Sequence, residues 1–142
     1  MLRTLFAFVS GVFAMMIVIT FIELANAKFF FPPPSGMDWT DSRAVTAFVA
    51  SLPASAMALV LIGWLLGAFV GAAVAARIAE RHRLPCALGI GVLVMLGVLD
   101  SARTISHPTW MIVLGVLLPL PLAWLGARLA ELQIQKGLAS TR

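Results

Sequence analysis

Long apolar runs alternate with short charged segments along this chain. Charged residues leave four uninterrupted runs of at least 16 residues, at 4–22, 44–76, 84–99 and 104–127. A helix that crosses the hydrocarbon core of a bilayer needs about 20 predominantly apolar residues. The first and fourth runs have about that length, whereas the second is too long for one helix and the third is short. The pattern therefore predicts several membrane-spanning helices.

Proline and charge positions adjust the boundaries of these helices. Pro53 interrupts the second run, because proline removes a backbone donor from a continuing helix. Residues 41–51 before it are predicted to form a short helix on the membrane surface, since their apolar residues recur at helical spacing. The third helix must extend through Asp100 and Arg103, which are three residues apart and can pair on one face. A pair of prolines inside the fourth run predicts a kink rather than a break.

The predicted fold is all-α, an integral membrane four-helix bundle with a short periplasmic interfacial helix before the second span. Residues 1–142 form a single transmembrane domain. Its predicted parts are spans at about 4–23, 53–77, 84–104 and 108–127, a periplasmic loop at 24–52 and a cytoplasmic tail at 128–142.

The composition supports a membrane protein and excludes other classes. Hydrophobic residues make up 61% and charged residues 11% of the chain, against about 45–50% and about 25% in ordinary soluble domains. A water-soluble globule and a disordered tail are therefore excluded. The single cysteine, Cys86, also excludes a disulfide scaffold.

The distribution of positive charge predicts the orientation. Seven of the ten Lys and Arg residues fall on the side of the two termini, and three fall on the side of the first loop. Cytoplasmic segments carry the excess of positive charge, so both termini are predicted to be cytoplasmic. An alternative stays open, because residues 1–27 end in Ala25-Asn26-Ala27 and have the pattern of a cleavable signal peptide. Retention is favoured, since the apolar run at 4–22 exceeds the usual length of a signal core.

Small residues recur at every fourth position of the second span. Helices in lipid associate through close packing of small residues and through polar contacts. The spacing places these residues on one stripe, which serves either packing within the chain, the simpler interpretation, or a homo-oligomer. The stripe consists of Gly63, Gly67, Gly71, Ala75 and Ala79.

Four polar residues are expected at the outer membrane boundary, and we call them the polar rim: Glu23, Asp100, Arg103 and His107. Ionisable groups at membrane depth are candidates for function. The competing interpretation is a structural ion pair of Asp100 with Arg103, helped by Glu23, that anchors the helix ends. The structural interpretation is favoured, because the groups lie at the rim and not at the midplane.

The loop after the first span combines aromatic residues with prolines. Consecutive prolines favour an extended path, and aromatic rings collect at membrane interfaces. The loop is therefore predicted to clamp the first span to the surface helix at the interface, with a lid or a docking strip as the alternative. Its residues of interest are Phe29, Phe30, Phe31, Pro32, Pro33, Pro34 and Trp39.

No residue pattern indicates a metal site or a cofactor, and a membrane enzyme is the third interpretation, with Glu23 or Asp100 and His107 as its acid–base candidates. His82 and His107 are predicted at opposite ends of the third helix, and Cys86 has no companion for a zinc site. Nucleotide-binding, hydrolase and metalloprotease motifs are absent. No nucleic acid is expected as a partner. The expected partners are the lipid bilayer and either a second copy or another membrane protein.

Several segments together resemble a known group of proteins. They are FPPPSGMDWTD after the first span, Leu52-Pro53, GWLLGAFVGAAVAARIA in the second span and His107-Pro108-x-Trp110 at the last span. They are similar to segments of uncharacterised small four-span bacterial inner-membrane proteins with an FPPPxG loop after the first span. The resemblance implies a location in the bacterial inner membrane and no activity.

These observations predict an accessory or scaffold subunit, or a self-associating bundle, rather than an enzyme. The alternative is a small transporter or channel that an oligomer forms and the polar rim guards. No acidic or basic residue falls near the centre of a predicted span, which argues against a proton-coupled carrier.

Overall fold

The computed structural model describes residues 2–38, 40–105 and 107–140, and every regular element in these ranges is helical. The elements in chain order are α1 (Leu2–Ala25), the π-helical turn η1 (Asn26–Phe30), α2 (Ser42–Ser51), α3 (Ala54–Ile78), α4 (Arg83–Thr104), α5 (Thr109–Leu117) and α6 (Pro119–Ser140). The all-α prediction is confirmed for this part of the chain.

Four helical segments are long and apolar enough to cross a membrane. They are Leu2–Phe30, Ala54–Ile78, Arg83–Thr104 and Thr109–Gly137. The predicted short helix before the second span is present as α2, which Asp41 caps by accepting a hydrogen bond from the backbone N–H of Arg43 at 2.9 Å. Val49 of α2 and Leu52 after it pack against the hydrophobic core.

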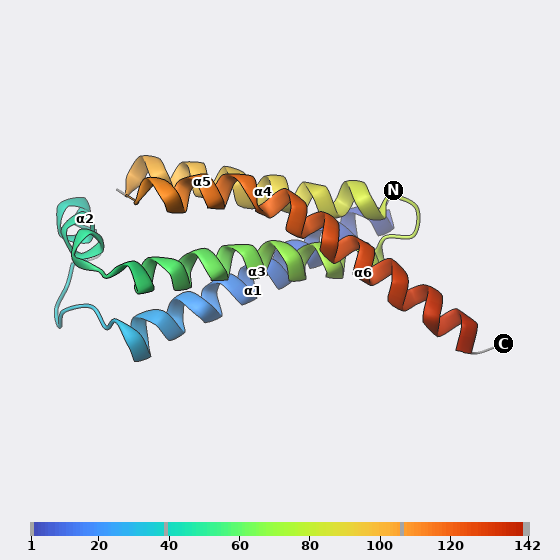
Figure 1. Cartoon of the computed structure of the whole chain (residues 1–142), viewed down its shortest axis with the longest axis horizontal. Coiled ribbons are helices and arrows are strands. Elements are labelled where there is room, and N and C mark those ends of the chain that lie inside the picture. Colours follow the sequence, from blue (N-terminus) through green and yellow to red (C-terminus); the bar gives the residue numbers. More distant parts are fainter. Residues whose placement is uncertain (1, 39, 106, 141–142) are drawn as a thin grey trace.

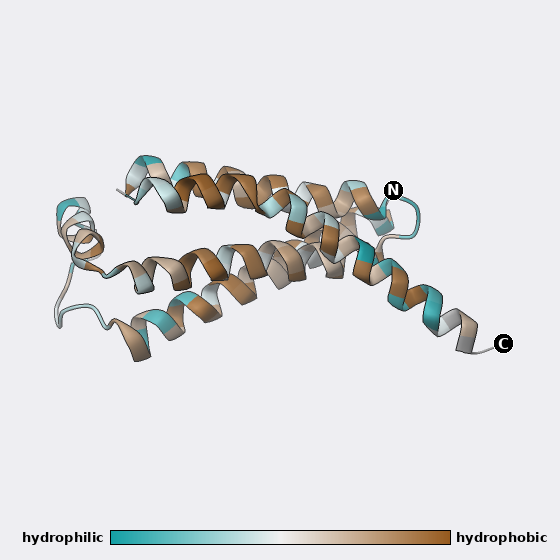
Figure 2. Ribbon diagram, viewed as in Figure 1, coloured by the Kyte–Doolittle hydropathy of each residue, from teal (hydrophilic) through white to brown (hydrophobic). Residues whose placement is uncertain are grey.

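The helices form an elongated bundle with two distinct ends. Figure 1 shows α1 running beside α3, and α4 running beside α5 and α6, with both chain termini toward the same end. We call this the terminal end, and the opposite end, which carries η1 and α2, the loop end. Apolar residues cover the middle of the long helices, whereas hydrophilic residues concentrate near the helix ends, in α2 and along the last part of α6 (Figure 2).

The first helix continues past its predicted end at residue 23. No proline or glycine follows until Pro32, so the backbone stays helical through Ala25 and then through the η1 turn. The backbone N–H of Phe31 closes η1 by donating to the carbonyl of Asn26 at 2.8 Å. A residue before proline avoids the helical region, which explains why the helix ends at Phe30.

The fourth span is kinked, as its two prolines predict. Helix α5 ends at Leu117 and α6 begins at Pro119, yet the backbone of Leu118 both donates to Leu114 at 3.0 Å and accepts from Leu122 at 3.1 Å. These bonds carry the helical ladder across the kink. The segment predicted as a tail at 128–142 is helical as far as Ser140, because it contains no helix breaker except one glycine.

Helix α3 lies at the centre of the bundle. Its alanines at 68, 72 and 76 are fully buried, and its other faces contact α1, α4 and α6. The backbone of α6 approaches closely at Gly126, where a Cβ atom would lie 2.5 Å from the carbonyl oxygen of Phe69. Small residues thus allow helices to pack around α3 at short range, as expected where lipid supplies no hydrophobic drive.

Candidate functional site

The small-residue stripe of α3 faces α1. A Cβ atom at Gly67 would lie 2.6 Å from the side chain of Ile19, and one at Gly71 would lie 2.7 Å from the carbonyl oxygen of Gly11. Gly63 lies against Ile22 one turn further on. The remaining members, at positions 75 and 79, are buried. The stripe therefore fixes the position of α1 along α3 within one chain.

Helices α1 and α4 meet only toward the terminal end. There the Cys86 thiol lies 3.9 Å from the carbonyl oxygen of Thr4, and a Cβ atom at Gly89 would lie 2.9 Å from the ring of Phe8. Toward the loop end the two helices separate, and a Cβ atom at Gly97 would have no neighbour within 4 Å. The separation leaves a groove of about 530 Å³ between α1 and α4.

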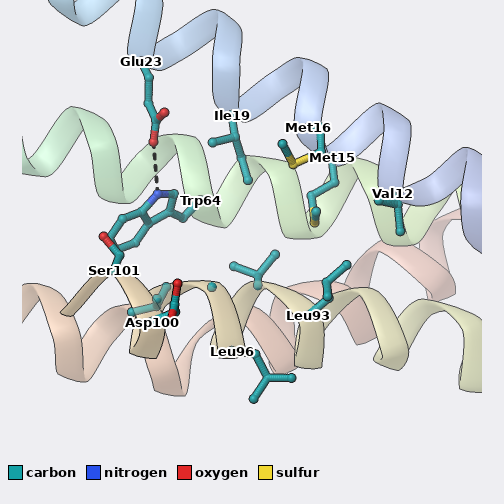
Figure 3. Close-up of a pocket in the computed structure, with 13 residues that line it drawn as sticks. Val12, Met15, Met16, Ile19, Glu23, Trp64, Leu93, Leu96, Asp100 and Ser101 are labelled. Carbon is teal, nitrogen blue, oxygen red and sulfur yellow. Dashed lines mark hydrogen bonds between the residues drawn. The ribbon is translucent and has the colours of Figure 1, made fainter. Parts of the chain in front are cut away.

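The α1–α4 groove has apolar walls and a polar end. Figure 3 shows apolar side chains of α1 and α4 along its length, and Trp64 of α3 between the two helices beside Glu23, Asp100 and Ser101. The apolar walls comprise Val12, Met15, Met16 and Ile19 from α1 and Leu93, Val94, Leu96 and Val98 from α4. Oxygen-bearing groups thus gather at one end of an otherwise apolar surface.

Trp64 connects two residues of the polar rim. Its indole Nε1 donates a hydrogen bond to Oε1 of Glu23 at 3.3 Å, and its ring centroid lies 5.8 Å from that of His107 with an interplanar angle of 52°. Trp64 is only 9% exposed, so the fold holds the indole in place. The His107 ring is in turn fixed by a contact of 2.8 Å between its Nδ1 and the carbonyl oxygen of Ile105.

The structure brings part of the polar rim together. Glu23 and Asp100 both line the α1–α4 groove, and His107 reaches it through Trp64. Arg103 does not line the groove, and its guanidinium forms no ion pair with Asp100. The expected ion pair is therefore not formed. Both side chains are exposed at the end of α4, where an ion pair contributes little.

Sequence reasoning missed two residues of this region, Trp64 and Asn26. The side chain of Asn26 is 7% exposed, its Nδ2 donates to the carbonyl of Ala56 at 3.2 Å, and its Oδ1 has no hydrogen-bond partner in the described structure. Each of the two residues has one feature in the sequence that could have singled it out. Trp64 is the one tryptophan in the interior of a predicted span, and Asn26 is the polar residue of the segment interpreted as a possible cleavage site.

The loop after the first span is only partly extended. Phe29 and Phe30, which were predicted to belong to the interfacial loop, belong to the η1 turn, because the helix persists up to the proline segment. Both rings are more than half exposed. Phe31 follows the turn half-buried, and residues 32–34 have no regular structure. Trp39, also predicted to belong to this interfacial loop, lies outside the described residues.

Hydrogen bonds order the second half of this loop. The hydroxyl of Thr40 donates to Oδ1 of Asp38 at 2.7 Å, and the backbone N–H of Thr40 donates to the same oxygen at 2.8 Å. These donors hold the pKa of the Asp38 carboxyl below its ordinary value, since they favour the charged form. Gly36 in the same loop has a φ of 79°, a conformation that favours glycine.

The described residues contain no group of three or more His, Cys, Asp or Glu side chains that could hold a metal ion. No family model matches the chain, and no curated protein or solved structure matches it. The α1–α4 groove thus combines apolar walls with a carboxylate-bearing end.

Proposed function

We propose that this protein is an accessory or scaffold subunit of the bacterial inner membrane, with both termini in the cytoplasm, and that its α1–α4 groove binds one transmembrane helix of a partner membrane protein. The observation that carries the proposal is the groove itself. It lies between two of the four helices long enough to cross a membrane, and two carboxylates line it.

The walls of the groove suit an apolar helix. Helix association in lipid depends on close packing, for which small residues provide room. Gly97 provides such room, because a Cβ atom there would meet nothing within 4 Å. A row of side chains from a partner helix can enter the groove beside Gly97, between Leu93 and Ser101 of α4 and Met16 of α1.

The end of the groove favours a partner helix with a basic residue. Neither Glu23 nor Asp100 forms an ion pair with a described cation. A helix seated in the groove would bury these carboxylates, and a buried carboxylate is costly unless a partner compensates its charge. A Lys or Arg on the partner helix, at the level of Glu23, would supply that compensation. The proposed occupant is thus an apolar helix with one cationic side chain near one end.

Designed transmembrane peptides test this proposal. The full-length protein is reconstituted in vesicles with a fluorescent Leu-rich helix that carries one Lys at the level of Glu23, and energy transfer reports binding. We expect this peptide to bind at least about tenfold more tightly than the same peptide with Leu in place of Lys, a factor that corresponds to about 1.4 kcal/mol. We expect Asp100→Asn together with Glu23→Gln to remove the preference.

Two matched variants locate the binding. Gly97→Leu fills the groove and should abolish peptide binding while the helical content stays unchanged. Val92→Leu enlarges an exposed side chain on the same helix outside the groove and should leave binding intact. Equal binding of the Lys and Leu peptides, or binding that survives Gly97→Leu, would contradict the proposal. If two copies of this chain show energy transfer and Gly97→Leu abolishes it, a second copy is the occupant instead.

The same carboxylates favour a second candidate function, an oligomeric transporter or channel. A transport path needs polar groups at membrane depth, and Glu23 and Asp100 are such groups in an accessible groove. Vesicles that contain the protein alone distinguish the two functions. Cation flux that Asp100→Asn abolishes would support transport, whereas a scaffold subunit gives no flux.

A further inference from the structure

Two cavities adjoin at the terminal end, at the opposite end of the bundle from the carboxylates of the α1–α4 groove. The first is apolar, has a volume of about 510 Å³ and is lined by Thr4, Leu5, Phe8, His82, Pro85 and Cys86. The second is polar, has a volume of about 290 Å³ and is lined by Arg3, Thr4, Glu80, Arg81 and His82. Thr4 and His82 line both, so the apolar and the polar cavity are neighbours.

The polar cavity carries a net positive charge. Nη1 of Arg3 lies 2.7 Å from Oε1 of Glu80, and Nε of Arg3 donates to the carbonyl of Ile78 at 3.3 Å, so this guanidinium is held at the cavity. Arg81 and His82 are exposed, and their side chains have no hydrogen-bond or ion-pair partner among the described residues. One carboxylate therefore faces two guanidinium groups and a histidine.

The apolar cavity extends from the polar cavity along the bundle. It follows α1 through Leu5, which is 60% exposed, to Phe8, one helical turn further on. On the other side it is bounded by Pro85 and Cys86 in the first turn of α4. An amphiphile matches this arrangement, because its negative head group would meet the cations of the polar cavity and its apolar chain the side chains of the apolar cavity.

We propose that the neighbouring cavities bind one anionic phospholipid, with its phosphate against Arg3 and Arg81 and an acyl chain in the apolar cavity. Arginine matches the geometry of phosphate oxygens, and basic pockets between transmembrane helices on the cytoplasmic side bind anionic lipid head groups. This site requires a bilayer but no partner helix, so it stands independently of the scaffold function.

Native mass spectrometry of the full-length protein tests the site. The protein is equilibrated with equal amounts of phosphatidylglycerol and phosphatidylcholine that carry identical acyl chains. We expect several-fold more phosphatidylglycerol on the wild type. Arg3→Gln together with Arg81→Gln should remove this preference, so that the two lipids bind about equally. The Arg3–Glu80 pair is solvent-exposed, so its loss should leave the helical content unchanged.

A matched variant separates the site from general charge attraction. Arg128→Gln together with Lys136→Gln removes the same charge from α6, whose C-terminal part lies at the same end of the bundle (Figure 1), and neither residue lines a cavity of the site. This variant should keep the preference for phosphatidylglycerol. Equal loss in the two double variants, or equal retention of both lipids by the wild type, would overturn the proposal.

A further variant tests the acyl chain. Thr4→Phe narrows the junction of the two cavities without changing charge and should weaken retention of phosphatidylglycerol. Glycerophosphoglycerol, the head group without acyl chains, should not displace the lipid at equal concentration. Displacement by this soluble head group would overturn the role of the apolar cavity and leave only a phosphate site.

Discussion

At the scale of single residues, the contacts of Trp64 determine which members of the polar rim lie together. Trp64 is the residue that links the rim, because its indole N–H bonds to Glu23 while its ring lies beside His107. This hydrogen bond joins α3 to α1, and removing one partner of such a bond leaves the other without its partner. Arg103 shows the opposite case, since its exposed position at the end of α4 keeps it out of the groove.

A double-mutant cycle measures the link between Trp64 and Glu23. Trp64→Phe removes the indole donor and should lower the free energy of unfolding by about 1–3 kcal/mol. The effect should shrink by at least about 0.5 kcal/mol in the background of Glu23→Leu, where no acceptor remains. Thermal unfolding in detergent provides the measurement. Trp124→Phe is the control, because Trp124 is 45% exposed and contacts Arg128 rather than the groove. An equal effect of Trp64→Phe in both backgrounds would show that the hydrogen bond contributes nothing.

At the scale of helices, two glycines inside apolar helices differ in how closely a neighbouring helix packs against them. Gly67 of α3 lies under Ile19 of α1, whereas Gly97 of α4 faces open space. The difference arises because α1 leans on α3 over the length of the stripe and departs from α4 toward the loop end. The small-residue stripe thus sets the contact between α1 and α3. Helix α4 has no such stripe against α1, so a groove remains between these two helices.

Leucine substitutions at these two glycines should separate packing from binding. Gly67→Leu places a Cβ atom 2.6 Å from Ile19 and should lower the free energy of unfolding by about 1–3 kcal/mol or more. Gly97→Leu should leave stability unchanged or slightly raised, because a Cβ atom there meets nothing within 4 Å, the groove has room for the rest of the side chain, and glycine is a poor helix former. Thermal unfolding of both variants in one detergent makes the comparison. Equal stability of the two variants would contradict the observed packing of α1 on the stripe.

At the scale of the whole molecule, four long helices return both termini to one end (Figure 1). The excess of positive charge lies at this same end, which is the basis for proposing that it faces the cytoplasm. The two binding surfaces proposed above then belong to different sides of the membrane. In the proposed orientation, the proposed lipid site would lie at the cytoplasmic side and the carboxylates of the groove toward the periplasm.

Cysteine labelling tests this orientation. Cys86, which is 6% exposed, is replaced by Ala, and single cysteines are introduced at Ser35 in the loop and at Gln135 in α6. A membrane-impermeant maleimide applied to spheroplasts should label the cysteine at position 35 at once. The cysteine at position 135 should react only after the membrane is opened. The reverse pattern would show that the termini face outward.

The sequence by itself determined the helical class, the four apolar spans, the short helix α2 and the kink near Pro119. These features follow from apolar run length and from proline, both of which act locally along the chain. Local signals were weaker at the ends of helices. The first helix continues through η1 to Phe30, and α6 continues to Ser140, because no helix-breaking residue stops them earlier. The predicted boundaries followed the first polar residues and therefore ended both helices too early.

Only the tertiary structure decided which polar residues meet. The spacing of Asp100 and Arg103 permits an ion pair that the structure does not form, while Trp64 contacts Glu23, a residue 41 positions away. Such contacts depend on how far α1 and α4 diverge, and that divergence follows from close packing of α1 against the glycines of α3. Packing between helices is a property of pairs of surfaces, so the pattern along one helix does not contain it.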